Sequence, residues 1–374
     1  MQTLIAKHTV EILLAKTFRA PVEITRTERI APWFVVRCFT ASPSAAVPPS
    51  VVVKTLRDGP RSQPEQLLTE QAALEFVAEL GPDLAPRLLA SHIQAGLLVL
   101  EDVAPRRPLA EIVLDDNADE AAAGLIDFAR ALGTLNAHSS GRQDAYYTRR
   151  RALGPVDPLA DRQWRWHPSK LHHALSSFQA LGMAPSTQAK TELDQALAEL
   201  LEPGPFLAFS NGDPGENNYL LHRGDGRLID FEEAGYHHAL IDATSLYVPW
   251  TIWVTASDPF ANGLETAYRS ALTTAVPEAA DDRRFGLGIA AACLVYALVV
   301  RMRLERLDQQ PAGDHSRLQM VSTLEAAARA AEHHRSLPHL SGWARKIAAT
   351  LRRRWPDADV DLGAYRDFTL RIRD

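Results

Sequence analysis

Short apolar runs typical of β-strands dominate the N-terminal part of the chain. Residues 22–26, 33–40 and 50–56 form such runs, and the last two are rich in β-branched and aromatic side chains. Residues 97–100 form a further apolar run. Before that run, apolar residues recur at helical spacing over residues 64–80. The pattern predicts an antiparallel sheet with one helix inserted between its strands.

From residue 104 onward the pattern is mainly helical. Residues 119–135 have strong helical character, with Asn117 or Asp119 as the candidate N-cap. Residues 188–201 predict another helix, and the chain is almost entirely helical from residue 259 to its end. These segments predict a large helical part that follows the sheet.

The order of the two patterns predicts an α+β chain with two lobes. A chain of 374 residues is too long for one small core, so two compact units are expected. We assign residues 1–103 to a mostly β N-lobe and residues 104–374 to a helical C-lobe.

Composition and charge indicate an ordinary globular protein, with 46% hydrophobic and 23% charged residues. The net charge of -6 argues against a nucleic-acid partner, which usually requires a basic face. The most apolar run, residues 289–300, is about half the roughly 20 residues of a membrane span and predicts a buried core helix. Cys38 and Cys293 lie in apolar stretches, which indicates buried free thiols. We therefore expect a cytoplasmic protein without a membrane partner; the oligomeric state stays open.

Two short segments contain the residue types that phosphoryl transfer needs. Asp213 lies on a Gly/Pro-rich loop, Asn218 follows five residues later, and Asp230 follows an apolar strand-like run. The reaction needs a carboxylate that orients a hydroxyl nucleophile and accepts its proton, and oxygen ligands that hold magnesium against the phosphates. Asp213 suits the first role, whereas Asn218 and Asp230 suit the second.

This block resembles the aminoglycoside phosphotransferase and choline kinase superfamily, whose members have a protein-kinase-like fold. The family pattern is His-Gly-Asp, four spacers, Asn, and then Ile-Asp-Phe/Trp-Glu. The resemblance implies that Asp213 is the catalytic residue and that Asn218 and Asp230 bind magnesium. Glu232 matches an acidic residue of the pattern, and Asp242 matches a structural aspartate downstream.

The upstream residues extend the resemblance to the nucleotide site. Lys54 lies in an apolar strand, like the phosphate-binding lysine of kinases, and Glu70 matches the helix glutamate that pairs with it. Glu101 and Val103 match the segment that leads to the adenine hinge. The resemblance implies that ATP or GTP binds with Mg²⁺ in a cleft between the lobes. Roughly residues 20–250 take part in the match.

Two departures from the family pattern concern the loops around the phosphates. Asn211 stands where the family usually has histidine, and an asparagine can also brace the loop by hydrogen bonds. The loop of residues 27–32 contains no glycine, so a Gly-rich phosphate loop is absent from the sequence. Phosphate binding by this loop is therefore expected to be weak.

The acceptor is the least determined part of the interpretation. Residues 141–170 interleave arginines with aromatic residues, and Trp164 and Trp166 are candidates for one wall of an acceptor site, together with Glu232. Such a wall would favour a planar, neutral or anionic acceptor. The alternative is a solvated loop whose aromatic residues pack against the core. For Glu232, metal support and a structural role are also open.

The best-supported function is a small-molecule kinase that phosphorylates a hydroxyl group, with antibiotic inactivation as one option. Metabolite kinases for choline-like amines, sugars or nucleosides are alternatives, as is a nucleotide-binding pseudokinase or regulatory module. A protein kinase is disfavoured because a recognisable activation segment is missing between Phe231 and Asp242. The adjacent histidines 172–173, 237–238 and 333–334 indicate surface or packing roles rather than a zinc site, since the sequence shows no Cys or carboxylate at zinc-ligand spacing.

Overall fold

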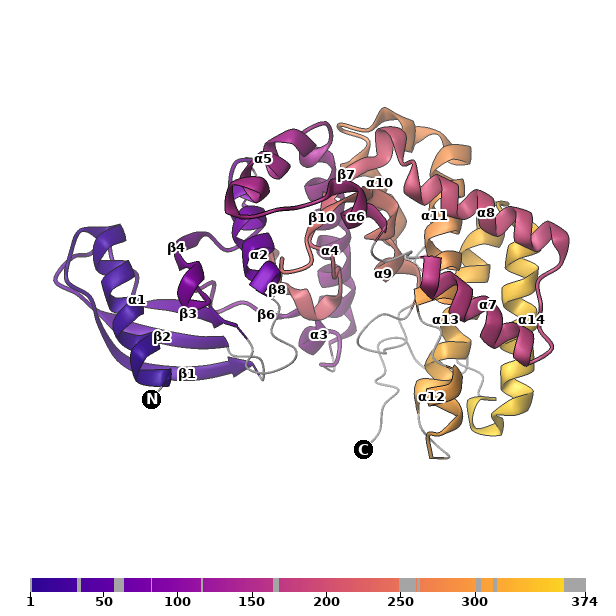
Figure 1. The fold of residues 1–374 in the computed structure, drawn as a ribbon, viewed down its shortest axis with the longest axis horizontal. Coiled ribbons are helices and arrows are strands. Elements are labelled where there is room, and N and C mark those ends of the chain that lie inside the picture. The colour runs from indigo at the N-terminus through magenta and orange to yellow at the C-terminus, as the bar shows by residue number, and fades with distance from the viewer. Residues whose placement is uncertain are drawn as a thin grey trace. The chain divides into compact units, whose positions relative to one another are not determined.

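The computed structural model forms two compact units (Figure 1). It describes residues 2–31, 35–56, 64–81, 83–115, 117–163, 168–248, 260, 263–300, 304–311 and 315–359. The first unit consists of Met1–Arg106, Asp144–Val156 and Arg227–Ala234, and the second of Arg107–Gln143, Asp157–Gly226 and Gly235–Asp374. The first unit therefore takes in two segments from much later in the chain.

An antiparallel sheet forms the centre of the first unit, as the sequence predicted, and it has five strands. Its strand order is β1-β2-β3-β5-β4. Helix α2 matches the predicted inserted helix, whereas α1 was not predicted. The elements of this unit are α1 (Gln2–Phe18), β1 (Glu23–Ala31), β2 (Val35–Ala41), β3 (Ser50–Thr55), α2 (Pro64–Val77), β4 (Leu88–His92), η1 (Ile93–Ala95), β5 (Leu97–Glu101) and most of α5 (Gln143–Leu153).

Helix α1 covers one face of this sheet. Val10 and Leu14 lie one helical turn apart and are buried in the same core cluster as Val51, Val53 and Val99. Side chains alternate along a strand, so the face of β3 opposite Val51 and Val53 is the face of Lys54. This alternation places the lysine away from the apolar core and toward helix α2.

Helix α5 and the segment around residue 230 complete the first unit on the side of α2. The Tyr146 ring packs edge-on against Phe76 with centroids 5.8 Å apart, and its hydroxyl donates to the carbonyl of Ala234 at 3.1 Å. The buried Arg150 donates through Nε to the Thr69 hydroxyl at 3.3 Å. Part of the Arg- and aromatic-rich stretch is thus packed against α2.

Helices make up most of the second unit, again as predicted. Asn117 caps α4, since its side chain accepts from the N–H of Glu120 at 3.2 Å. The elements are β6 (Arg107–Pro108), α3 (Leu109–Ile112), α4 (Ala118–Ser139), α6 (Pro158–Gln163), α7 (Pro168–Ala180), α8 (Thr187–Leu201), η3 (Gly204–Phe206), β7 (Leu207–Ser210), η4 (Glu216–Asn218), β8 (Tyr219–His222), β9 (Asp225–Leu228), β10 (Gly235–His238), η5 (Ala239–Ile241), α9 (Thr244–Tyr247), α10 (Leu264–Leu272), η6 (Pro277–Ala280), α11 (Asp282–Val295), η7 (Tyr296–Val300), α12 (Leu304–Asp308), α13 (His315–His333), α14 (Pro338–Arg354) and η8 (Pro356–Ala358).

The close approach of α4 and α10 organises the centre of the second unit. A Cβ at Gly133 would lie 2.4 Å from the carbonyl oxygen of Tyr268, so only glycine fits at this crossing. Strand β7 pairs with β10 in register, with Ser210 opposite Gly235. The loop that follows β7 is therefore fixed at its start by a short antiparallel pair.

The apolar run near residue 289 lies inside the second unit. Helix α11 is buried from Ile289 to Val295, which confirms the predicted core helix. Cys293 on α11 and Cys38 on β2 are buried free thiols, as expected. Among the residues that the structure describes, no helix is long and apolar enough to span a membrane.

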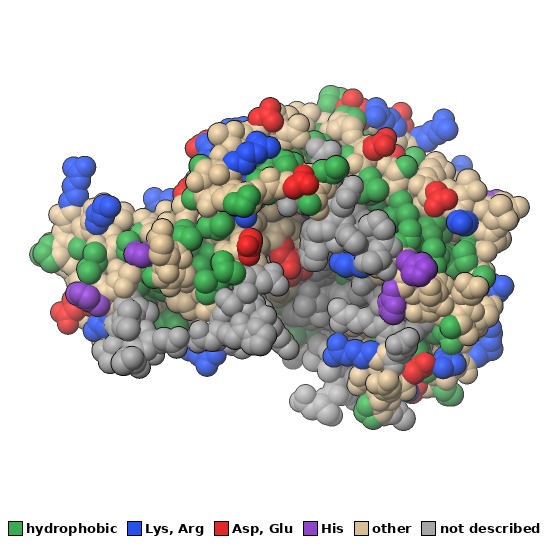
Figure 2. Space-filling model, viewed as in Figure 1, with side chains coloured by type: hydrophobic (Ala, Val, Ile, Leu, Met, Phe, Trp, Pro, Cys, Tyr) green, Lys and Arg blue, Asp and Glu red, His purple; other side chains and the backbone are tan. Residues whose placement is uncertain are grey.

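The surface carries both signs of charge. On the face drawn in Figure 2, acidic and basic side chains are interspersed over the described atoms. Large apolar side chains are exposed at scattered positions, among them Ile12 and Leu159.

Candidate active site

A charge cluster in the first unit joins three of the residues predicted from the sequence. Lys54 Nζ on β3 lies 2.7 Å from Oε2 of Glu70 on α2 and 2.7 Å from Oδ1 of Asp230. Glu70 is 2% exposed, so its side chain is shielded from water. The structure therefore places the lysine between two carboxylates.

The two carboxylates hold Lys54 in its charged form. Burial works to lower the pKa of Lys54, but the charges of Glu70 and Asp230 outweigh that effect and raise the pKa well above its usual value. The side chain is thus a positioned ammonium point charge, which suits the binding of phosphate oxygens.

Asp230 reaches this cluster through an unusual backbone conformation. Its φ angle is 62°, in the left-handed region that aspartate and asparagine tolerate better than most residues. Leu228, two residues before Asp230, anchors the segment, since its N–H donates to the carbonyl of Leu84 at 2.7 Å.

Glu232 joins the same group of carboxylates. Carboxylate oxygens of Glu70, Asp230 and Glu232 all lie within 4.8 Å of one another, and Gln66 Nε2 donates to Glu232 Oε1 at 3.3 Å. Hard cations such as Mg²⁺ prefer oxygen ligands of this kind. The donor set therefore fits a magnesium ion, and it places Glu232 with the metal candidates.

The predicted hinge residues lie at the end of β5. Glu101 binds Arg87, whose Nε donates to Oε2 at 3.2 Å, and Val103 is buried. Asp102 between them accepts hydrogen bonds from Arg37 Nε at 2.7 Å and from the Ser50 hydroxyl at 2.7 Å. Sequence reasoning missed the Asp102 network; adenine binding by Glu101 and Val103 stays a prediction.

The loop after β7 in the second unit holds the candidate catalytic residue. Asn218 Nδ2 donates to the backbone carbonyl of Asp213 at 2.9 Å and to its Oδ2 at 3.1 Å. Asn211 Nδ2 makes a longer contact of 3.5 Å with the same carbonyl. Both asparagines thus brace the loop that presents Asp213, and Asn211 does so at the position where the family has histidine.

A buried polar network lies directly behind this loop. Asp242, fully buried, accepts from the Ser210 hydroxyl at 2.5 Å and from Asn136 Nδ2 at 3.0 Å. The Tyr268 hydroxyl donates to Asn136 Oδ1 at 2.7 Å. The N–H of Gly212 donates to Ser210 Oγ at 2.9 Å, which connects the network to the loop. The sequence pointed to Asp242 as structural, but it gave no signal for Ser210 or Tyr268.

Glu216 is a further carboxyl group in this loop that sequence reasoning missed. Burial and the nearby charge of Asp213 raise the pKa of Glu216 to about 7, although a hydrogen bond from its own backbone N–H acts in the opposite direction. It is buried, and its position inside the motif gave no separate signal in the sequence.

The predicted residues are thus distributed over both units. Lys54, Glu70 and Asp230 belong to the first unit, whereas Asp213 and Asn218 belong to the second. Trp164 and Trp166, the predicted acceptor wall, lie outside the described residues. The binding of ATP in a cleft between two lobes stays a prediction.

The sequence and these motifs define a kinase-like phosphotransferase. Residues 46–285 match the family model of the phosphotransferase enzyme family, and the chain belongs to that family. This confirms the predicted resemblance and, with the β-rich first unit and the helical second unit, the predicted α+β protein-kinase-like fold. A comparison with curated proteins finds no match.

Several solved kinase structures are similar to this chain. A choline/ethanolamine kinase family protein from Mesorhizobium loti is 17% identical, with 94% of this chain and 100% of that chain covered and a TM-score of 0.45. Choline kinase from Cryptosporidium parvum is 12% identical over 92% of this chain and 99% of that chain, with a TM-score of 0.48. An amicoumacin kinase in complex with AMP-PNP is 16% identical, with 87% of this chain and 88% of that chain covered and a TM-score of 0.42.

Proposed function

We propose that the protein transfers the γ-phosphate of ATP to a hydroxyl group of a small molecule and uses Mg²⁺. The observation that supports this most strongly is the position of Lys54, whose ammonium lies 2.7 Å from both Glu70 and Asp230. A buried carboxylate that holds a lysine at a fixed point provides a preorganised positive charge for nucleotide phosphates.

The residues of the first unit bind and orient the nucleotide in this proposal. Lys54 contacts phosphate oxygens while Glu70 keeps its ammonium in place. Asp230, with support from Glu232, supplies carboxylate oxygens to the metal, and Mg²⁺ when bound neutralises phosphate charge. GTP in place of ATP would make the same phosphate contacts.

Asp213 acts on the acceptor. Its carboxylate accepts a hydrogen bond from the acceptor hydroxyl and orients the oxygen toward the γ-phosphorus. It takes the proton as the new P–O bond forms and as the bond from the γ-phosphorus to the bridging oxygen breaks, which releases ADP. Asn218 holds Asp213 by its two hydrogen bonds. Its predicted role as a second metal ligand requires its Oδ1, which accepts from Asn217 Nδ2 at 2.9 Å.

The acceptor class is proposed only at the level of a hydroxyl-bearing small molecule. Aminoglycosides, other antibiotics, choline-like amines, sugars and nucleosides are all candidates. Arg150 of the predicted wall region is buried against Thr69. Arg150 is therefore not available to an acceptor wall in that stretch.

Two substitutions at matched aspartates test the assignment of roles. Asp230→Asn should weaken Mg²⁺-dependent ATP binding, whereas Asp213→Asn should leave ATP affinity nearly intact and reduce kcat by about 10²–10⁴-fold. Asp194→Asn on α8 is the control, because Asp194 is exposed and lies outside the site. The measurements are ATP titration with and without Mg²⁺, and ATP consumption over a panel of hydroxyl-bearing metabolites and antibiotics. ATP binding without turnover of any panel member would favour a pseudokinase.

A further inference from the structure

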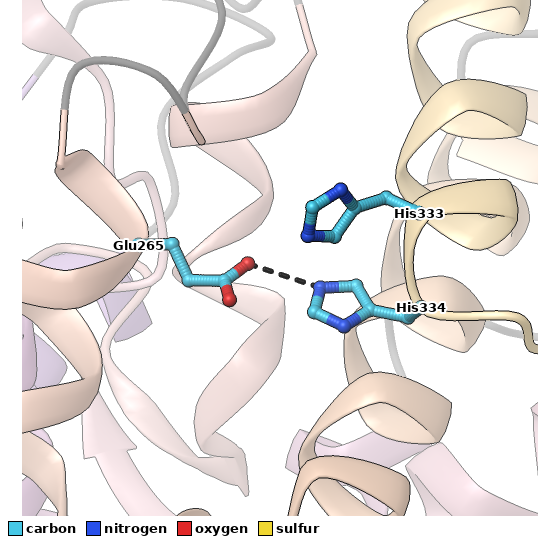
Figure 3. A group of neighbouring side chains, drawn as sticks. All are labelled: Glu265, His333 and His334. Carbon is cyan, nitrogen blue, oxygen red and sulfur yellow. Dashed lines mark hydrogen bonds and ion pairs between the residues drawn. The ribbon is translucent and has the colours of Figure 1, made fainter.

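A second group of ligand-type side chains lies in the second unit, away from the sequence motifs. Glu265 is on α10, His333 is the last residue of α13, and His334 follows it. One ligand atom from each of the three lies within 4.8 Å of the others. Figure 3 shows the Glu265 carboxylate directed toward the two imidazole rings. In the described part of the chain, the only other such group is the carboxylate group of Glu70.

The spacing of these atoms is close to that of ligands around one metal ion. His334 Nε2 lies 3.0 Å from Glu265 Oε2. Two ligand atoms that each lie about 2.0–2.1 Å from a tetrahedral zinc ion are roughly 3.3–3.5 Å apart. A small outward shift of either side chain would therefore accommodate an ion between them.

The surrounding residues hold the ligands in place. The Tyr247 hydroxyl donates to Glu265 Oε2 at 2.6 Å, which fixes the carboxylate as outer contacts do in metal sites. Phe260 stacks on His333 with centroids 3.7 Å apart. A Cβ at Gly286 would lie 2.8 Å from Cβ of His334, so glycine lets the histidine approach α11. The three side chains are thus positioned by neighbours on α9 and α11 and by Phe260.

We propose that Glu265, His333 and His334 bind a divalent transition-metal ion of the zinc class. Two imidazole nitrogens and one carboxylate oxygen favour zinc, cobalt or nickel over magnesium, which prefers oxygen ligands alone. Three protein ligands leave one tetrahedral position for water or an exogenous ligand. This site is independent of the phosphate-binding residues of the first unit.

Metal binding would join α10 to the end of α13. Helix α10 also contains Tyr268, which donates to Asn136 in the network behind the catalytic loop. An ion at Glu265 therefore stabilises the helix that supports this network. The expected consequence is a higher unfolding temperature with zinc present, even without nucleotide.

Isothermal titration of ZnCl₂ into metal-free, untagged full-length protein tests the proposal. An excess of MgCl₂ is included to occupy sites made of oxygen ligands alone. His333→Ala should weaken zinc binding at least about tenfold. His333 is exposed, so its removal leaves the core intact. The control is His172→Ala/His173→Ala on α7, another adjacent and exposed pair, which should retain the wild-type affinity.

A second readout is independent of any variant. Cobalt bound to the wild-type protein should give the visible absorption bands of a four-coordinate site with nitrogen ligands, and ZnCl₂ should abolish them. Equal zinc affinity in the wild-type protein and His333→Ala would overturn the proposal. A cobalt spectrum like that of the aqueous ion would also overturn it, and so would an equal loss of affinity in the His172/His173 control.

Discussion

Removal of the Asp242 carboxylate tests the buried network behind the catalytic loop. Asp242 accepts at least two hydrogen bonds, from Ser210 and from Asn136. A hydrogen bond to a charged group contributes about 1.5–3 kcal/mol, and an unpaired buried donor is costly. Asp242→Ala should therefore lower the free energy of unfolding by about 3–6 kcal/mol.

The same substitution should also slow catalysis. Ser210 Oγ accepts the N–H of Gly212, the residue that precedes Asp213. When Asp242 is lost, the Ser210 hydroxyl is free to rotate, and the loop that presents Asp213 loses its anchor. We expect a lower kcat with little change in ATP affinity, because the residues of the first unit that we propose to bind the nucleotide are unchanged.

Urea unfolding followed by circular dichroism measures the stability, and steady-state kinetics measure kcat. Tyr268→Phe is a graded control, since it removes one hydroxyl that donates to Asn136 and to the carbonyl of Ala239. It should cost about 1–2 kcal/mol. Asp194→Asn on the surface should stay within about 0.5 kcal/mol of the wild type. A loss below about 1 kcal/mol in Asp242→Ala, with normal kcat, would refute this account of the network.

Three further predictions follow from the charge clusters and the thiols. Burial acts to raise the pKa of Asp102, but hydrogen bonds from the Ser50 hydroxyl and the Arg37 guanidinium outweigh it and lower that pKa. The stability that ionised Asp102 contributes is therefore present above about pH 4 and is lost as the pH falls through the pKa of Asp102 in the folded protein. Asp102→Asn should therefore show a shallower loss of stability in urea titrations as the pH falls from about 5 to about 2. Burial raises the pKa of Cys38 to about 11 and that of Cys293 further, so a disulfide reagent should label both thiols only after unfolding. Lys54→Met leaves the Glu70 and Asp230 carboxylates without their cation, so the unfolding temperature of the variant should fall. Mg²⁺ should raise the unfolding temperature of the variant more than that of the wild type.

The sheet of the first unit was predictable because its strands depend on local composition. The β-branched run at residues 51–53 predicts a strand, and the alternation of side chains along any strand turns Lys54 away from the face of Val51 and Val53. Helix α1 was not predicted, because charged residues interrupt its apolar positions. Val10 and Leu14 become recognisable as a helix face only through their contact with the sheet.

The active-site motifs were predictable in order, but their surroundings were not. Asp213 and Asn218 lie within one short loop, where spacing along the chain nearly equals spacing in the fold. In contrast, Glu265 lies on α10 and His334 directly follows α13, so the two residues are far apart in the sequence and a local spacing rule cannot detect such a pair. For that reason the sequence predicted only a surface or packing role for the adjacent histidines 333 and 334.

The first unit is built from three separate segments of the chain, which affects how it folds during synthesis. The strands of its sheet are complete at Glu101, but Tyr146, Asp230 and Ala234 join the unit from later in the chain. At about 5–20 residues per second, the ribosome needs roughly 7–27 additional seconds to reach Ala234. Until then Lys54 lacks its ion pair with Asp230, and by the time Asp230 is made much of the second unit has been translated. A nascent chain that stops shortly after β5 therefore contains the sheet without the Lys54–Asp230 ion pair of the proposed phosphate-binding site.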